Sequence, residues 1–70
     1  MPERVPDGSG GEILIEFVVH GAVVKVTAID PKSGIEACIV GPSSAPRHVL
    51  QANAVQKLAY VIRKKRGEAG

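Results

Sequence analysis

The feature that most constrains the fold is a run of alternating apolar residues, which occurs three times before residue 41. Residues 12–19 read EILIEFVV, residues 22–29 read AVVKVTAI, and residues 35–40 read IEACIV. Successive side chains of a β-strand point to opposite faces of a sheet, so each run predicts a strand with one wholly apolar face. The short connections between the runs favour antiparallel hairpins.

The first hairpin turn is predicted at His20-Gly21, with the glycine meeting the demand for positive φ at the second loop position. This loop places apolar partners on one face and a charged pair on the other, as cross-strand pairing requires. The predicted pairs are Phe17 with Val24, Ile15 with Val26, Ile13 with Ala28, and Glu16 with Lys25.

The second turn is predicted at DPKSG, residues 30–34. Asp30 can accept hydrogen bonds from the turn backbone, Pro31 presets φ, and Gly34 supplies the left-handed conformation that ends the turn. This loop predicts pairing of Ala28 with Ala37 and of Val26 with Ile39. The third strand is then expected to stop at Gly41-Pro42.

Residues 43–66 change to helical spacing. Ser43 or Ser44 can cap the helix, Pro46 is tolerated in its first turn, and Gly67 stands where a C-terminal cap belongs. One apolar stripe follows the helix at intervals of three and four residues. It consists of Leu50, Ala54, Val55, Leu58, Val61 and Ile62. The prediction is an α+β domain, in which a three-stranded antiparallel meander carries one C-terminal helix on one face.

The two ends of the chain have a different composition. Residues 1–11 contain two prolines and three glycines but little apolar surface, which predicts a disordered N-terminal tail. Residues 68–70 are assigned to a second disordered tail, so residues 12–67 form the single domain. A core of that size is marginal for independent folding, and oligomerisation is a common remedy.

Three segments of the chain are similar to a known family: GEILIEF, VKVTAIDPKSGIEACIVGP and AVQKLAYVIRKKRG. Together they resemble a family of short bacterial proteins of unknown function that shares the strand order, an Asp-Pro-x-x-Gly hairpin and the Lys-Leu-x-Tyr-Val helix. The resemblance covers residues 11–67 and implies no activity, so no functional residue follows from it. The family's helices usually open with acidic residues, and Ala45 to His48 depart from that pattern.

The composition argues against several functional classes. Phe17 and Tyr60 are the only aromatic residues, whereas single-stranded nucleic-acid platforms stack bases on several. No apolar run approaches the length of a membrane span. The single cysteine, Cys38, suits a reducing compartment, so a cytoplasmic location is expected.

Catalytic, metal and cofactor sites are not expected. Cys38 and His20 are separated along the predicted sheet by roughly 20 Å, at about 3.3 Å per residue, which is too far for a nucleophile and its base. The pairing of Cys38 with His48, at the start of the helix, stays open on the sequence alone. One cysteine and two distant histidines do not have zinc-ligand spacing, and no small-molecule ligand is evident. Cys38 is therefore interpreted as a small apolar strand residue and the chain as a non-enzyme.

Two surfaces remain as functional candidates. The helix segment has six basic and no acidic residues between positions 43 and 67, which gives the alternative of a nucleic-acid-binding face. Its predicted contacts are Lys57, Tyr60, Arg63 and Lys64, with Asn53 and Gln56 beside them. Basic residues near a helix C-terminus also simply complement the helix dipole.

The preferred candidate is the sheet face that the helix does not cover. Apolar side chains on it predict a partner, either a second copy in a homodimer or an unknown protein. The predicted interface comprises Leu14, Val18, Val23, Thr27, Ile29, Cys38 and Val40. The edge of the first strand, protected only by Glu12 and Glu16, is the alternative contact.

Overall fold

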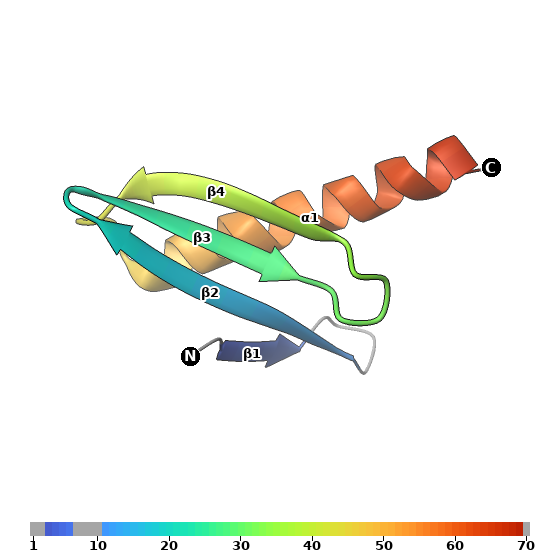
Figure 1. The fold of residues 1–70 in the computed structure, drawn as a ribbon, viewed down its shortest axis with the longest axis horizontal. Coiled ribbons are helices and arrows are strands. Elements are labelled where there is room, and N and C mark those ends of the chain that lie inside the picture. Colours follow the sequence, from blue (N-terminus) through green and yellow to red (C-terminus); the bar gives the residue numbers. More distant parts are fainter. Residues whose placement is uncertain (1–2, 7–10, 70) are drawn as a thin grey trace.

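The computed structural model describes residues 3–6 and 11–69 as one four-stranded antiparallel sheet and one helix (Figure 1). The strands are β1 (Glu3–Pro6), β2 (Glu12–His20), β3 (Val23–Ile29) and β4 (Glu36–Pro42), in the spatial order β1-β2-β3-β4. Helix α1 (Arg47–Ala69) follows β4. The predicted α+β class, antiparallel sheet and C-terminal helix are confirmed, but the prediction of three strands is wrong.

The additional strand, β1, lies in the segment predicted to be a disordered tail. It pairs with the first half of β2, so that Val5 lies opposite Ile13. A strand with one apolar residue cannot fold alone, but the open edge of β2 supplies backbone partners, and Pro6 is tolerated because β1 is itself an edge. The tail prediction is therefore wrong for residues 3–6, while residues 1–2 and 7–10 lie outside the described residues.

The β2–β3 hairpin has the predicted faces but not the predicted register. Its two-residue loop is Gly21-Ala22, with Gly21 at φ 59° in the first loop position, as a type II′ turn requires. Moving the loop by one residue shifts the pairing by two. The observed pairs are Ile15 with Ala28, Phe17 with Val26, Val19 with Val24, Glu16 with Thr27 and Val18 with Lys25. A shift of two keeps every side chain on its predicted face, since the side-chain period is two.

The β3–β4 hairpin confirms its predicted pairs, Ala28 with Ala37 and Val26 with Ile39. In the DPKSG turn the Asp30 carboxylate accepts hydrogen bonds from the Lys32 backbone N–H at 3.1 Å and from the Ser33 hydroxyl at 2.9 Å. Gly34, at φ 76°, donates its N–H to the Asp30 carbonyl at 2.8 Å. Strand β4 runs through Gly41-Pro42 rather than stopping before them.

The helix begins at Arg47, and the two serines do not cap it. The carbonyl of Pro46 accepts hydrogen bonds from the N–H groups of Val49 and Leu50, at 3.1 and 3.2 Å. The predicted C-terminal cap is also wrong, because Gly67 lies within a helix that continues to Ala69. Residues 68–69 were expected in the C-terminal tail and are helical instead, while residue 70 lies outside the described residues.

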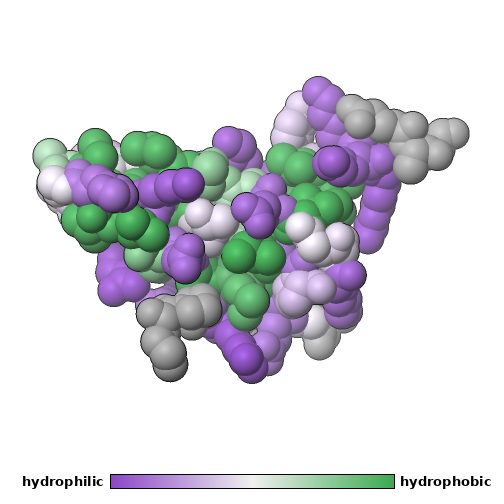
Figure 2. Space-filling model, viewed as in Figure 1, coloured by the Kyte–Doolittle hydropathy of each residue, from purple (hydrophilic) through white to green (hydrophobic). Residues whose placement is uncertain are grey.

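Helix α1 packs on one face of the sheet, mainly over β4 and β3, and its C-terminal end extends past the strands (Figure 1). The opposite face of the sheet carries no second layer in residues 3–6 and 11–69. Apolar side chains on that face are interrupted by hydrophilic ones (Figure 2). No helix in the described part of the chain is long and apolar enough to cross a membrane.

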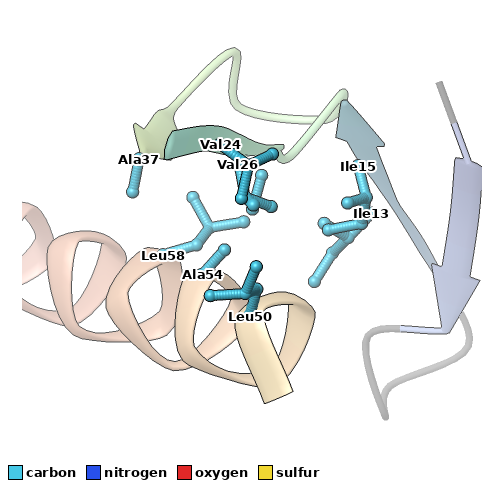
Figure 3. Packing of buried hydrophobic residues seen from close by; sticks show 9 residues of the cluster. Ile13, Ile15, Val24, Val26, Ala37, Leu50, Ala54 and Leu58 are labelled. Atoms are coloured by element: carbon cyan, nitrogen blue, oxygen red, sulfur yellow. The ribbon is translucent and has the colours of Figure 1, made fainter. Parts of the chain in front are cut away.

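The core is aliphatic and small, and the helix and three strands contribute to it (Figure 3). Three helix residues of the predicted stripe are buried, namely Leu50, Ala54 and Leu58. The buried strand residues are Ile13, Ile15, Val24, Val26, Ala28 and Ala37. The other members of the stripe, Val55, Val61 and Ile62, are only partly buried. The predicted inner face is therefore confirmed, but the helix buries less of its stripe than expected.

Candidate interaction surfaces

The seven residues of the predicted interface all lie on the outer face, which is the sheet face opposite α1. Cross-strand pairing arranges them in rows, with Val18 and Val40 on either side of Lys25. Thr27 and Cys38 form the next row, beside Glu16. Leu14 and Ile29 form the row after that, between Arg4 of β1 and Glu36 of β4. The structure therefore brings together every residue that the alternation assigned to this face.

The most exposed residues of the predicted interface lie near the β2–β3 turn. Val40 is 66% exposed, Val23 45% and Val18 37%. The remaining four predicted residues are half-buried: Leu14, Thr27, Ile29 and Cys38. The strongest apolar patch is thus a valine cluster around Lys25, rather than a stripe along the whole sheet.

Charged side chains of both signs share the outer face with the valines. Arg4 forms an exposed ion pair with Glu12 at 3.7 Å. Glu16 does not lie opposite Lys25, as predicted, but opposite Thr27. Lys25 lies instead between Val18 and Val40, and its side chain is exposed. The outer face therefore carries exposed groups of both signs beside the valines.

The edge of β2 was the alternative predicted contact, and β1 covers its first half, residues 12–15. No strand lies beyond residues 16–20 in the part of the chain that the structure describes. The guanidinium of Arg47 closes this corner, since it lies 4.2 Å from the centre of the Phe17 ring. It also contacts the Glu3 carboxylate at 2.8 Å. Arg47 thus joins β1, β2 and the start of α1.

The opposite edge of the sheet, β4, is protected by a lysine. Ser43 donates its N–H to the Ala22 carbonyl at 2.8 Å, which makes their pair a hydrogen-bonded one. Bonded and non-bonded pairs alternate in antiparallel sheets, so the Cys38 carbonyl points away from β3, to the free edge. There it accepts a hydrogen bond from the Lys57 ammonium at 2.8 Å. A lysine at this place discourages the addition of another strand.

The predicted nucleic-acid contacts are only partly brought together. Tyr60 is 54% exposed, and the Lys64 ammonium lies 5.9 Å from the centre of its ring. Arg63 is exposed one residue before Lys64, whereas Lys57 bonds to the edge of the sheet. The two ion pairs found among residues 3–6 and 11–67 involve no helix cation beyond Arg47. The charge of the C-terminal half of α1 is therefore not neutralised by the sheet.

A groove that periodicity could not reveal lies between the C-terminal half of α1 and the nearby end of the sheet. Its volume is about 340 Å³. Ile13 of β2 lines it together with apolar residues of the helix and charged residues of the helix and the DPKSG turn. The other lining residues are Asp30, Lys32, Val55, Leu58, Ala59, Ile62, Arg63 and Arg66. Neighbouring elements contribute to it from distant parts of the chain, which explains why no local sequence signal marks it.

The structure places Cys38, His20 and His48 on three different elements. Cys38 is half-buried and lies opposite Thr27, which lies opposite Glu16. His20 lies two strands across the sheet from Cys38 and a further four residues along β2, which is roughly 13 Å at about 3.3 Å per residue. His48 is exposed in the first turn of α1. Within the described residues, no three His, Cys, Asp or Glu side chains are grouped so that they could hold a metal ion.

The comparisons with known proteins agree with the sheet-and-helix unit as a single family domain. No curated protein and no solved structure is significantly similar to the chain. Residues 10–65, which span β2, β3, β4 and most of α1, match one family. The chain therefore belongs to the family described as Domain of unknown function (DUF6898).

Proposed function

We propose that this chain is a non-enzymatic protein-interaction module that forms a homodimer through the outer face of its sheet. The observation that carries the proposal is the exposed cluster of Val18, Val23 and Val40 on a face that no other described element covers. A cluster of exposed apolar side chains on a small protein is typical of an interaction site. The single cysteine supports a cytoplasmic location for this module.

Charges on the outer face favour a second copy over an unrelated partner. A two-fold interface uses the same patch on both subunits, so it needs groups of both signs on one surface. The outer face provides them, with Lys25 and Arg4 as cations and Glu12, Glu16 and Glu36 as carboxylates. Each Lys25 would then meet a carboxylate of the other copy while the valines pack between them.

The dimension of the outer face predicts a weak dimer. Strands β2 to β4 cover roughly 14 Å by 23 Å, at about 4.8 Å between strands and about 3.3 Å per residue. A stable interface typically buries about 800 Å² on each partner. The smaller face, with three exposed valines, leaves little free energy after the entropic cost of association. We expect a dissociation constant in the micromolar range or above.

Sedimentation velocity over a range of concentrations tests this proposal. Val40→Lys should convert the protein to a monomer, because it places a second charge within the valine cluster that the dimer would bury. Val19→Lys is a matched control, since Val19 is 64% exposed, against 66% for Val40, but lies on the inner face. A wild-type protein that remains monomeric at high concentration, or equal effects of the two substitutions, would contradict the proposal.

One observation favours nucleic-acid binding by α1 as a second candidate. The exposed ring of Tyr60 lies beside Arg63 and Lys64, neither of which has an ion-pair partner in the described residues. This combination can stack a base and contact phosphates. The protein should then retain a single-stranded oligonucleotide, and this retention should weaken steeply as the salt concentration rises.

The matched comparison uses two double substitutions with the same change in charge. Arg63→Glu with Lys64→Glu should abolish retention, while Lys25→Glu with Lys32→Glu, on the sheet and its turn, should reduce it little. Retention that is equally weak in both variants would indicate only a general effect of net charge.

A further inference from the structure

The groove between α1 and the sheet has the composition of a binding site rather than of a packing defect. Its volume of about 340 Å³ is within the range of roughly 300 to 1,000 Å³ that is common for ligand sites. Its apolar floor comes from Ile13 of β2 and from Val55, Leu58, Ala59 and Ile62 of α1. Ile13 and Leu58 are buried, so the apolar surface that a ligand can reach is that of Val55, Ala59 and Ile62. The floor remains open because α1 extends past the sheet here, which leaves Ile62 only partly buried.

The rim of the groove is positively charged. Lys32 reaches it from the DPKSG turn, and Arg63 and Arg66 reach it from the helix. The only carboxylate in the lining is Asp30, and both of its oxygens accept hydrogen bonds from its own turn. None of the three cations belongs to an ion pair within residues 3–6 and 11–67. With three cations and one carboxylate, the described rim has a net positive charge that a ligand can match.

The length of the groove indicates the kind of ligand. Residues 55 to 66 of α1 line it and span roughly 17 Å of helix, at about 1.5 Å per residue. Five residues of an extended peptide, at about 3.3 Å each, have the same length. The groove is partly open to solvent, so a chain can enter it from the surface without threading into a closed cavity.

We propose that this groove binds an acidic peptide segment of a partner protein. An aliphatic side chain of the segment packs on Val55, Ala59 and Ile62, and flanking carboxylates pair with Lys32, Arg63 and Arg66. The apolar floor determines where the segment binds, and the cationic rim selects its charge. This site is on the inner side of the sheet, so it is independent of the proposed dimer face.

Fluorescence anisotropy with a labelled peptide of sequence EELLEE tests the proposal on the full chain. Lys32→Glu with Arg66→Glu should weaken binding by about tenfold or more, because two attractive contacts become repulsive. Lys64→Glu with Lys65→Glu changes the net charge equally but lies outside the groove lining, and should weaken binding less than about threefold. All four side chains are exposed, so both variants should keep the fold, as circular dichroism can verify.

The peptide EEGGEE tests the apolar floor and should bind about tenfold more weakly than EELLEE, since it has no side chain to bury. Equal binding of the two peptides, or equal loss in the two protein variants, would overturn the proposal. The proposal would also be overturned if a single-stranded oligonucleotide bound the wild-type protein more tightly than EELLEE does. In that outcome, the oligonucleotide would lose affinity only for the Lys64→Glu, Lys65→Glu variant. Sedimentation of the same variants reports on the dimer separately.

Discussion

Gly41 shows how a single residue sets the distance between the helix and the sheet. A Cβ atom at this position would lie 2.6 Å from Cδ2 of Leu50, well inside contact distance. Leu50 is 5% exposed and anchors the start of α1 on β4. The glycine therefore provides space for the leucine, since its backbone has no positive φ that would itself require glycine.

Gly41→Ala should lower the free energy of unfolding by about 1 to 3 kcal/mol, because Leu50 must leave its position in a tightly packed core. Gly67→Ala provides the contrast. No atom lies within 4 Å of its Cβ position, and the residue is helical. Alanine there should stabilise the protein by about 0.5 kcal/mol. Urea unfolding of the two variants should give opposite signs, and a destabilising effect of both would contradict the packing argument.

At the scale of elements, the attachment of β1 depends on few contacts. Its only apolar residue, Val5, is half-buried, and Glu3 is bound by Arg47 at 2.8 Å. Both side chains of that ion pair are substantially exposed, so the pair contributes at most about 1 kcal/mol. The contact of Arg47 with the Phe17 ring adds a similar amount.

Arg47→Ala should therefore loosen β1 without unfolding the domain. Amide hydrogen exchange should accelerate in residues 3–6 and change little in β3, because local opening of a weakly held strand precedes global unfolding. Arg63→Ala removes an equal charge from the far end of the helix and should leave β1 protected. Uniform acceleration along all four strands would show that Arg47 acts on global stability instead.

The β4 edge provides a second test at this scale. Replacing Lys57 with valine removes the ammonium that bonds to the Cys38 carbonyl, so the edge should become open to another strand. Light scattering should show faster aggregation of Lys57→Val than of wild type. Lys64→Val adds the same apolar group on the outward side of the helix, and it should aggregate more slowly than Lys57→Val.

For the whole molecule, stability and self-association should be linked. Nine of the described residues are buried in the core, and three of them are alanines. The free energy of unfolding of the monomer should therefore be small. Burial of the outer face by a second copy adds to that free energy, and the added free energy rises with the logarithm of protein concentration above the dissociation constant. A dependence of stability on protein concentration therefore distinguishes a dimer that buries the outer face from an exposed apolar face with no role.

The melting temperature of wild-type protein should rise by several degrees between about 5 µM and about 500 µM, because mass action favours the dimer. The Val40→Lys variant should melt at one temperature throughout this range. Val19→Lys should retain the concentration dependence. A wild-type melting temperature that is independent of concentration would indicate that self-association does not contribute to stability.

Much of the architecture could be predicted from local patterns. Alternation identified β2, β3 and β4 and the correct face of every residue in them, because the direction of a strand side chain depends only on its position along the strand. The DPKSG turn was predicted for the same reason, since Asp30 and Gly34 determine it through contacts within five residues. The seven residues of the outer face followed directly from this alternation.

Long-range packing determined the remaining features, and no local pattern contains that information. The observed β2–β3 register differs from the predicted one by two residues, because two loops are compatible with the same strand faces. Pairing along the whole hairpin selects the Gly21-Ala22 loop. Strand β1 required an open edge of β2, which exists only after the sheet has formed. The groove beside Ile62 depended on how far α1 extends past the sheet, because a helical stripe predicts which side chains face inward but not what lies opposite them.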